Sequence, residues 1–246
     1  MKTTSSHKAL KFQNNSSLNV EDDLVVEESL LINVNYKPFT LTMRSPGNEE
    51  ELVRGLLFTE NILQKDVPFQ YQITEKKNGI ITAVNVEIDE KHIQSDKLDK
   101  RNLLSVSSCG ICGKLELNAK CEHLQSIESN QKLEVSKLEM MFSEMSKHQE
   151  IFKKTGGCHA SAAFDIDGNL LSIKEDIGRH NAVDKVIGDL LINQKLDKAF
   201  VILCSGRISY EIVSKVYISQ IPFLAAVSSV SSLAVELADD YGITML

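Results

Sequence analysis

The sequence Ala199-Phe200-Val201-Ile202-Leu203-Cys204-Ser205-Gly206-Arg207 joins an apolar run of strand length to a short polar loop, and a helical pattern follows. The same order returns from Pro222, with an apolar run to Val227, a serine-rich loop and a second helical pattern. A third apolar run begins at Ile243. Strand, loop and helix repeated in this order predict parallel strands joined by right-handed crossovers. The C-terminal part of the chain is therefore predicted to be α/β.

The loops that follow these strands are candidates for binding an anion. In open sheets of this kind, ligands bind beyond the carboxyl ends of the strands. Both loops contain serine and precede helices, whose first N–H groups are free to bind phosphate. Arg207 adds a guanidinium suited to bidentate phosphate contact, and Ser205 adds a hydroxyl. The alternative that needs no ligand is that the serines only cap the helices.

Two upstream clusters carry further polar groups. In the run Glu175-Asp176-Ile177-Gly178-Arg179-His180-Asn181, Arg179 and His180 stand at the predicted start of a helix. This position favours anion contact, so both residues join the candidate pocket. The other cluster is Thr155-Gly156-Gly157-Cys158-His159, and we interpret its single histidine as a core or capping residue.

The remaining patterns indicate a mixed chain of two domains. Residues 1–20 are polar and predict a disordered leader. Alternating apolar residues then predict two hairpins with one helix between them, turning at Lys37-Pro38 and at Asn78-Gly79. We expect an N-terminal α+β domain over residues 21–105 and a layered domain over 106–246. In the second domain, one helical stripe is interpreted as core, not as a cofactor contact; it consists of Leu138, Met141, Phe142, Met145 and Phe152.

The run Cys109-Gly110-Ile111-Cys112-Gly113 is the main candidate for chemistry, and we place it in a loop at the start of the second domain. The flanking glycines have no side chains to shield the sulfurs. Lys114 favours the thiolate, which is the reactive form of cysteine. Two other interpretations stay open, namely half of a structural zinc site and two incidental thiols. Since a structural zinc site usually needs four ligands and the chain has one such pair, we expect no metal.

Composition limits the class of protein. The chain has 246 residues, 42% of them hydrophobic, and a net charge of −7, which disfavours a general nucleic-acid binder. No signal peptide follows Met1, and the apolar run at 221–227 is too short to cross a bilayer. We therefore expect a cytoplasmic protein whose five cysteines are mostly free thiols.

Five motifs occur in the order seen in the FdhD family of formate dehydrogenase accessory sulfurtransferases, and the sequence resembles that family from about residue 22 to its end. The motifs are Arg44-Ser45-Pro46-Gly47-Asn48-Glu49-Glu50, Ser107-Ser108-Cys109-Gly110-Ile111-Cys112-Gly113, Thr155-Gly156-Gly157-Cys158-His159, Asp176-Ile177-Gly178-Arg179-His180-Asn181-Ala182-Val183-Asp184-Lys185 and Ser205-Gly206-Arg207.

This resemblance implies a cytoplasmic sulfur carrier. A cysteine desulfurase would load a persulfide on Cys109, and Cys112 would assist its release or resolve the persulfide. The sulfur would pass to the molybdenum cofactor, a bis-molybdopterin guanine dinucleotide bound as substrate, before its insertion into formate dehydrogenase. The resemblance also implies a homodimer and a second domain with the αβα layers of cytidine deaminases. In the family, a glycine- and basic-residue loop that resembles part of the guanine-nucleotide site follows the strand starting at Ile243; the present sequence ends at Leu246.

Three other functions compete with this one. A zinc deaminase needs a Glu two residues after its His, whereas Ser161 stands at that position after His159. A thioredoxin-type oxidoreductase shares the C-x-x-C spacing but carries it in an early βαβ unit. A chaperone that binds the cofactor without sulfur chemistry would not need Cys109.

Overall fold

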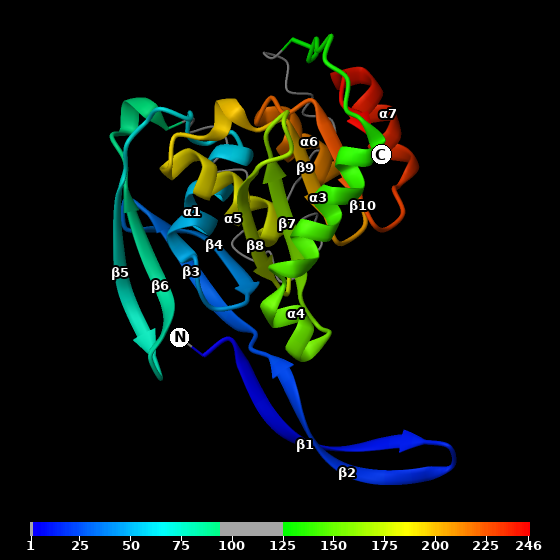
Figure 1. The fold of residues 1–246 in the computed structure, drawn as a ribbon. Coiled ribbons are helices and arrows are strands. Elements are labelled where there is room, and N and C mark those ends of the chain that lie inside the picture. The colour runs from blue at the N-terminus through cyan, green and yellow to red at the C-terminus, as the bar shows by residue number, and fades with distance from the viewer. Residues whose placement is uncertain (1, 94–124) are drawn as a thin grey trace.

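The structure is a computed structural model, and it describes residues 2–93 and 125–246. Cys109, Cys112 and the predicted domain boundary between residues 105 and 106 lie outside the described residues. Figure 1 shows three parts: a long hairpin at the N-terminus, a sheet next to it in the sequence, and a larger sheet covered by helices. This arrangement is the mixed α/β fold that the sequence predicts.

The first sheet has four strands in the order β4-β3-β6-β5. Its turns depend on residues with positive φ: Asn78 and Gly79 form the predicted turn, whereas the other hairpin turns at Asn35 and Tyr36 instead of Lys37-Pro38. Helix α1 packs its apolar side on this sheet. The elements are β3 (Glu28–Val34), β4 (Lys37–Arg44), α1 (Glu49–Thr59), β5 (Gln70–Lys77), β6 (Ile80–Glu87) and a 3-10 turn (Glu90–His92).

The second sheet has five strands in the order β11-β10-β9-β7-β8. Strands β9, β10 and β11 are parallel, which confirms the prediction from the C-terminal pattern. Strand β7 runs antiparallel to both β8 and β9. The strands are β7 (His159–Phe164), β8 (Leu170–Asp176), β9 (Val201–Cys204), β10 (Phe223–Ala226) and β11 (Thr244–Met245).

Helices cover both faces of this sheet (Figure 1). Side chains of β9 alternate between the faces: Ile202 and Cys204 pack toward α5, α6 and α7, while Val201 and Leu203 pack toward α3. The helical stripe from Leu138 to Phe152 lies on two successive helices, α3 and α4. The helices are α3 (Val135–Lys147), α4 (Glu150–Thr155), α5 (Arg179–Ile192), α6 (Tyr210–Ile218) and α7 (Ser232–Tyr241), with a 3-10 turn at Leu196–Lys198.

The prediction of a disordered leader over residues 1–20 was wrong. Strands β1 (Thr4–Gln13) and β2 (Ser16–Val25) form an antiparallel hairpin that turns at Asn14-Asn15, both at positive φ. An opposite-charge pair faces across it, with Lys8 opposite Glu21. Such pairs stabilise a polar hairpin that composition alone does not indicate. We call residues 4–25 the arm.

Two glycines bring helix α1 against helix α5. A Cβ atom on Gly188 would lie 1.8 Å from the carbonyl oxygen of Glu51, and one on Gly55 would lie 1.8 Å from that of Asp184. The helices therefore touch through their backbones, and no side chain fits between them. This contact fixes the four-stranded part against the helices of the larger sheet.

Gly188→Ala is expected to destabilise the protein by about 3 kcal/mol or more, because the methyl group must push two backbones apart. Urea unfolding followed by circular dichroism measures the change. Gly157→Ala is the matched control: its Cβ would meet Val25 at an ordinary 3.5 Å. An unchanged unfolding midpoint for Gly188→Ala would show that the helices do not touch in this way.

Candidate functional site

The candidate site lies where the strands of the five-stranded sheet end, at the start of β7 and after β8, β9 and β10. We call this end of the sheet the site edge. Strand β7 begins there with His159, opposite Asp176 at the end of β8. The loops after β9 and β10 reach the same edge and pair through Ile208 and Val230. The Ile208 N–H donates to the Ser229 carbonyl at 3.1 Å. The two loops expected at the carboxyl ends of parallel strands are therefore side by side.

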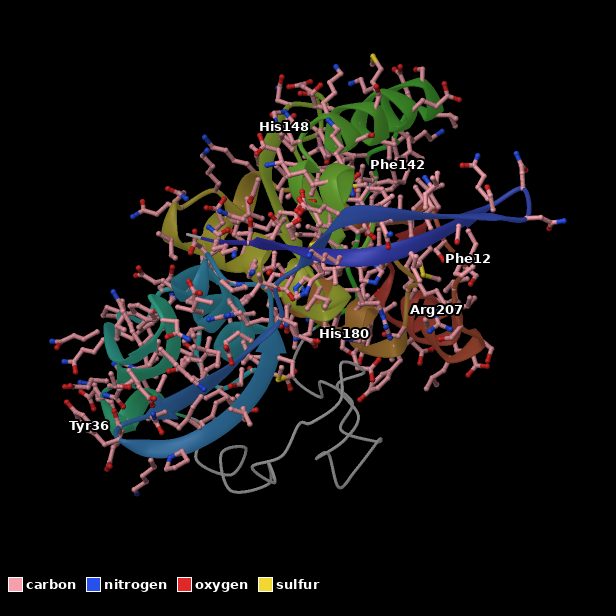
Figure 2. The ribbon with its side chains drawn as sticks, turned by 90° about the horizontal axis from the view of Figure 1, so that it is seen from below. Phe12, Tyr36, Phe142, His148, His180 and Arg207 are labelled. Atoms are coloured by element: carbon pink, nitrogen blue, oxygen red, sulfur yellow. The ribbon has the colours of Figure 1, made fainter. Side chains whose placement is uncertain are left out.

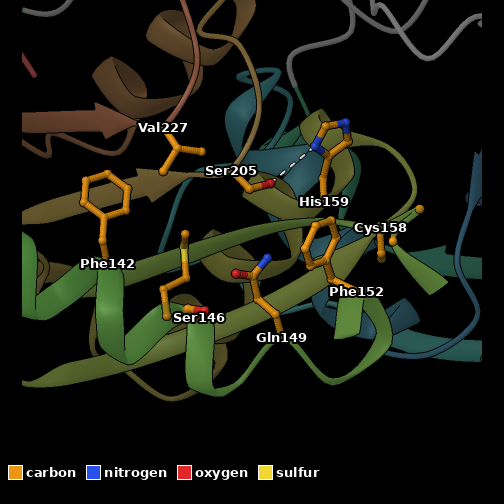
Figure 3. Close-up of a pocket in the computed structure, with 11 residues that line it drawn as sticks. Phe142, Ser146, Gln149, Phe152, Cys158, His159, Ser205 and Val227 are labelled. Carbon is orange, nitrogen blue, oxygen red and sulfur yellow. Dashed lines mark hydrogen bonds between the residues drawn. The ribbon is translucent and has the colours of Figure 1, made fainter. Parts of the chain in front are cut away.

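Ser205 and His159 form the polar centre of the site edge (Figure 3). The hydroxyl of Ser205 accepts the Ala160 N–H at 2.9 Å and lies 3.3 Å from Nδ1 of His159. The ring nitrogen and the hydroxyl share one hydrogen bond, and the tautomer of the ring decides which of them donates. Burial, with the nearby Arg179 charge, lowers the pKa of His159. This shift favours the neutral form of the ring.

Gly206 leaves room for Arg179 beside this histidine. A Cβ atom at Gly206 would lie 3.1 Å from the His159 ring and 3.3 Å from Cδ of Arg179. The glycine therefore allows both side chains to pack on the loop backbone. Nε of Arg179 is buried and has no hydrogen-bond partner among the described residues. The structure thus brings Arg179 and Ser205, two of the four pocket candidates, around His159.

The other two candidates lie differently. Arg207 is exposed at the outer end of the same loop (Figure 2). His180 is buried, with its Nε2 3.1 Å from the Ser209 hydroxyl and 3.9 Å from the Glu211 carboxylate at the start of α6. Its ring therefore lies against the start of α6. Ligand contact by these residues stays a prediction.

A cavity of about 490 Å³ opens beside the Ser205–His159 pair. The interpretation of the helical stripe as core holds for Met141, but Phe142 and Phe152 line this cavity. Phe152 stands four residues before Gly156 in the sequence, and both line the cavity. This closeness in the sequence was a signal that the stripe could contribute to a site. The lining residues are Phe142, Met145, Ser146, Gln149, Phe152, Gly156, Gly157, Cys158, His159, Ser205 and Val227.

The two acids near the site have structural roles. The carboxylate of Glu175 accepts the N–H groups of Ile151 and Phe152, both at 2.8 Å, and so holds the start of α4. Asp176 is fully buried and pairs with Lys185 at 2.7 Å. It also accepts the Ser45 N–H at 3.2 Å. Neither carboxylate is free to act as a catalytic base.

Lys185 completes a connection between two distant motifs. Its ammonium group donates to the Ser45 carbonyl at 3.0 Å as well as to Asp176. The Ser45 hydroxyl in turn accepts the Ile177 N–H at 3.0 Å. The motif that begins at Arg44 and the motif that begins at Asp176 therefore bind each other, and this contact fixes the entrance of α5.

Cys158 and Cys204 are the cysteines in the described part of the chain, and both are buried. Burial raises the pKa of each thiol to about 12; the carboxylates of Glu175 and Asp176 contribute at Cys158. Neither is therefore a thiolate at neutral pH, and Cys204 packs in the core. A nucleophilic sulfur must come from the cysteines outside the described residues.

Thiol labelling tests whether Cys158 and Cys204 are buried and unreactive. At pH 8, Cys158 and Cys204 are expected to react with iodoacetamide about a thousandfold more slowly in the folded protein than in urea, because a thiol with this pKa is almost wholly protonated. Peptide mass spectrometry after timed quenching gives the rate at each cysteine. Modification of either residue as fast as in urea would contradict the buried placement.

No group of three or more His, Cys, Asp or Glu side chains is placed to hold a metal ion within residues 2–93 and 125–246. In the same ranges, no helix is both long and apolar enough to span a membrane.

The fold and the site define a mixed α/β protein whose candidate site lies at the loop edge of a helix-covered sheet. A solved structure from Desulfotalea psychrophila, provisionally described as a formate dehydrogenase accessory protein, has this fold with a TM-score of 0.75. The match covers 99% of this chain and 92% of the other, at 20% sequence identity.

Sequence comparison is more specific. The FdhD/NarQ family model matches residues 25–246. A relative from Mycolicibacterium paratuberculosis, named sulfur carrier protein FdhD, is 38% identical over all of this chain and 93% of its own length. A relative of the same name from Sulfolobus acidocaldarius is 38% identical over 92% of this chain and 85% of its own length. The chain belongs to the FdhD/NarQ family.

Proposed function

We propose that this chain is a cytoplasmic sulfur carrier that accepts persulfide sulfur from a cysteine desulfurase and passes it to the molybdenum cofactor of a formate dehydrogenase. One observation carries the proposal: relatives at 35% to 39% identity over 92% or more of the chain are named sulfur carrier protein FdhD. The C-x-x-C pair supplies the thiols that this chemistry needs.

The first step loads the carrier. The Cys109 thiolate attacks the outer sulfur of the desulfurase persulfide, and a new S–S bond forms at Cys109. The old S–S bond breaks, and the desulfurase cysteine leaves as a thiolate. The burial of Cys158 and Cys204 supports the choice of nucleophile, because their raised pKa values leave neither of them reactive.

The second step releases the sulfur. The Cys112 thiolate attacks Sγ of the Cys109 persulfide, and a Cys109–Cys112 disulfide forms. The outer sulfur leaves as hydrosulfide with both electrons of the broken bond and is delivered to the molybdenum of the substrate. A cellular dithiol then reduces the disulfide and restores the carrier.

The site edge is proposed to hold the substrate, bis-molybdopterin guanine dinucleotide, by its phosphates. Support comes from the start of α5, α6 and α7 near this edge, where free N–H groups favour anions. Arg179 and Arg207 provide positive charge, and Ser205 and the neutral His159 provide hydrogen-bond donors. The contribution of His180 would require its ring to leave Ser209.

A cytidine-deaminase-like layering of the second domain is part of this proposal, and helices on both faces of the mixed sheet support it. Deaminase chemistry is not supported. The residue two positions after His159 is Ser161, which is fully buried and donates its hydroxyl to the Leu203 carbonyl at 2.9 Å. Ser161 is therefore part of the sheet packing. It is not an acid and cannot replace the glutamate that transfers protons in the deaminases.

Maturation in cells tests the proposal. In a host that lacks its own FdhD-type protein, expression of this chain should restore formate dehydrogenase activity together with sulfur on the purified cofactor. Activity that returns without added sulfur on the cofactor would instead favour a chaperone that only binds the cofactor.

A further inference from the structure

Gln149 places a buried amide in the cavity beside the Ser205–His159 pair. Gln149 is 8% exposed and is one of the residues that line this cavity. Figure 3 shows its amide pointing into the cavity, between Phe142 and Phe152. Within residues 2–93 and 125–246, no group forms a hydrogen bond with this amide. Because a buried amide without a partner is unfavourable in a folded protein, this group is available to a ligand.

The fold makes no other use of this amide. Gln149 stands at the N-cap of α4, where a side chain often accepts one of the first helical N–H groups. Its amide forms no such bond, and the Glu175 carboxylate accepts the N–H groups of Ile151 and Phe152 instead. The backbone carbonyl of Gln149 accepts the Lys153 N–H at 3.0 Å, so only the backbone of this residue serves the helix. Glu175 therefore takes the structural role that a side chain at this position usually has.

The rest of the cavity wall is aromatic on one side and suits an uncharged ligand. Phe142 and Met145 lie on α3, Phe152 lies on α4, and all three line the cavity. Phe152 is 45% exposed, so part of its ring is open to a ligand. None of the described lining residues is Asp, Glu, Lys or Arg, and the lowered pKa of His159 favours its neutral form. Such a wall accepts a flat ring better than it accepts a phosphate.

The chemistry of an amide indicates which kind of ring fits. A glutamine side chain offers an acceptor oxygen beside a donor N–H. It can therefore form two parallel hydrogen bonds with a lactam, that is, with an N–H next to a C=O on the edge of a ring. Proteins hold flat heterocycles by stacking on aromatic side chains and by hydrogen bonds to the ring edges. The volume of about 490 Å³ has room for a fused two-ring heterocycle.

We propose that Gln149 is a specificity-determining residue that binds the lactam edge of a fused heterocycle in this cavity. Its Oε1 accepts the ring N–H and its Nε2 donates to the ring C=O, while Phe142 and Phe152 contact the ring faces. Arg179, which packs beside His159 at the site edge, supplies charge for a phosphate attached to the ring. This inference rests on the proposed function, whose substrate contains two rings with a lactam edge, a guanine and a pterin.

Titration calorimetry of the full chain tests this role with two probes, guanosine 5′-monophosphate and pterin. The wild-type chain should bind at least one of them, and the probe that binds identifies the ring. Gln149→Leu should weaken this binding about tenfold or more, because leucine has a similar volume and cannot form the two hydrogen bonds. Phe152→Ala should weaken it by a similar factor through lost stacking. Gln131→Leu is the matched control, because Gln131 is an exposed glutamine outside the cavity lining.

A blocked probe separates the hydrogen bonds from packing. Methylation of the lactam nitrogen should weaken binding to the wild-type chain about tenfold or more, and should have much less effect on Gln149→Leu. Circular dichroism confirms that each variant is folded, and the exposure of Phe152 makes Phe152→Ala a second variant expected to fold. Binding of neither probe by the wild-type chain, equal binding of the methylated probe, or wild-type affinity in either variant would each overturn the inference.

Sulfur loading separates a failure of this inference from a failure of the proposed function. Intact mass after incubation with a desulfurase and cysteine should show one added sulfur in both the wild-type chain and Gln149→Leu, because the loading step does not use the cavity. Loading without ring binding would overturn the inference alone. Ring binding without loading would contradict the proposed function alone.

Discussion

Formate dehydrogenase matured with the Cys109→Ala chain is expected to contain about one hundredth or less of the sulfurated cofactor obtained with the wild-type chain. Removal of a covalent nucleophile eliminates the persulfide intermediate on Cys109. The described cysteines cannot substitute, because burial raises the pKa of both Cys158 and Cys204 to about 12. Cyanide-releasable sulfur on the purified cofactor, measured beside enzyme activity, gives the ratio.

Two further variants make this result specific. Cys112→Ala should still accept sulfur and release it more slowly, so its effect should be smaller than that of Cys109→Ala. Cys204→Ala removes a buried thiol of the core and should leave sulfuration within about twofold of wild type in folded protein. Full sulfuration with Cys109→Ala would contradict the carrier mechanism and leave only a cofactor-binding role.

Lys185→Met is expected to destabilise the protein by about 3–5 kcal/mol, the largest effect on stability predicted here. The ammonium group is buried 2.7 Å from Asp176, which is itself fully buried. Its removal leaves a carboxylate without its cation in a site that water does not reach. Urea unfolding at pH 7 gives the change in free energy.

A second variant separates the cost of the unpaired Asp176 carboxylate from the cost of lost packing at Lys185. Asp176→Asn combined with Lys185→Met removes both charges and should recover part of the loss. Lys65→Met is the matched control, since Lys65 forms an exposed pair with Asp197 at 3.0 Å and should cost under about 1 kcal/mol. Equal destabilisation by Lys65→Met and Lys185→Met would contradict the importance of the buried pair.

The sequence predicted the elements that have a regular pattern. Strands β9 and β10 are short apolar runs bounded by polar loops, and their parallel pairing follows from the helices between them. The turn at Asn78-Gly79 follows from its residue types, which tolerate positive φ. The arm was missed because its strands are mostly polar, a composition that is typical of disorder.

Only part of the candidate site could be predicted, because some of its residues stand at regular positions in the pattern and others do not. Ser205 and Arg179 were identified from their positions after strands and before helices. His159 was set aside because a lone histidine gives no signal, and its contacts with Ser205 and the Gly206 loop join residues 46 or more positions apart. Asp176 belongs to the same motif as Arg179, and its buried ion pair with Lys185 makes it part of the packing around the site.

The division between structural and chemical residues has a physical basis. Buried charges such as Asp176 and Lys185 are neutralised by each other and by backbone groups, so they fix the geometry around the site edge. Sulfur transfer requires the opposite environment, a thiol with access to solvent and a pKa near neutrality. Cys158 and Cys204 do not meet this requirement, because burial raises the pKa of both thiols to about 12.

Intact-mass spectrometry of the chain after incubation with a cysteine desulfurase and cysteine tests the central proposal most directly. We predict an added mass of about 32 Da, one sulfur atom, that is removed by dithiothreitol and absent from the Cys109→Ala chain. An unchanged mass in the wild-type chain, or the same added sulfur in Cys109→Ala, would contradict the proposal that Cys109 carries the sulfur.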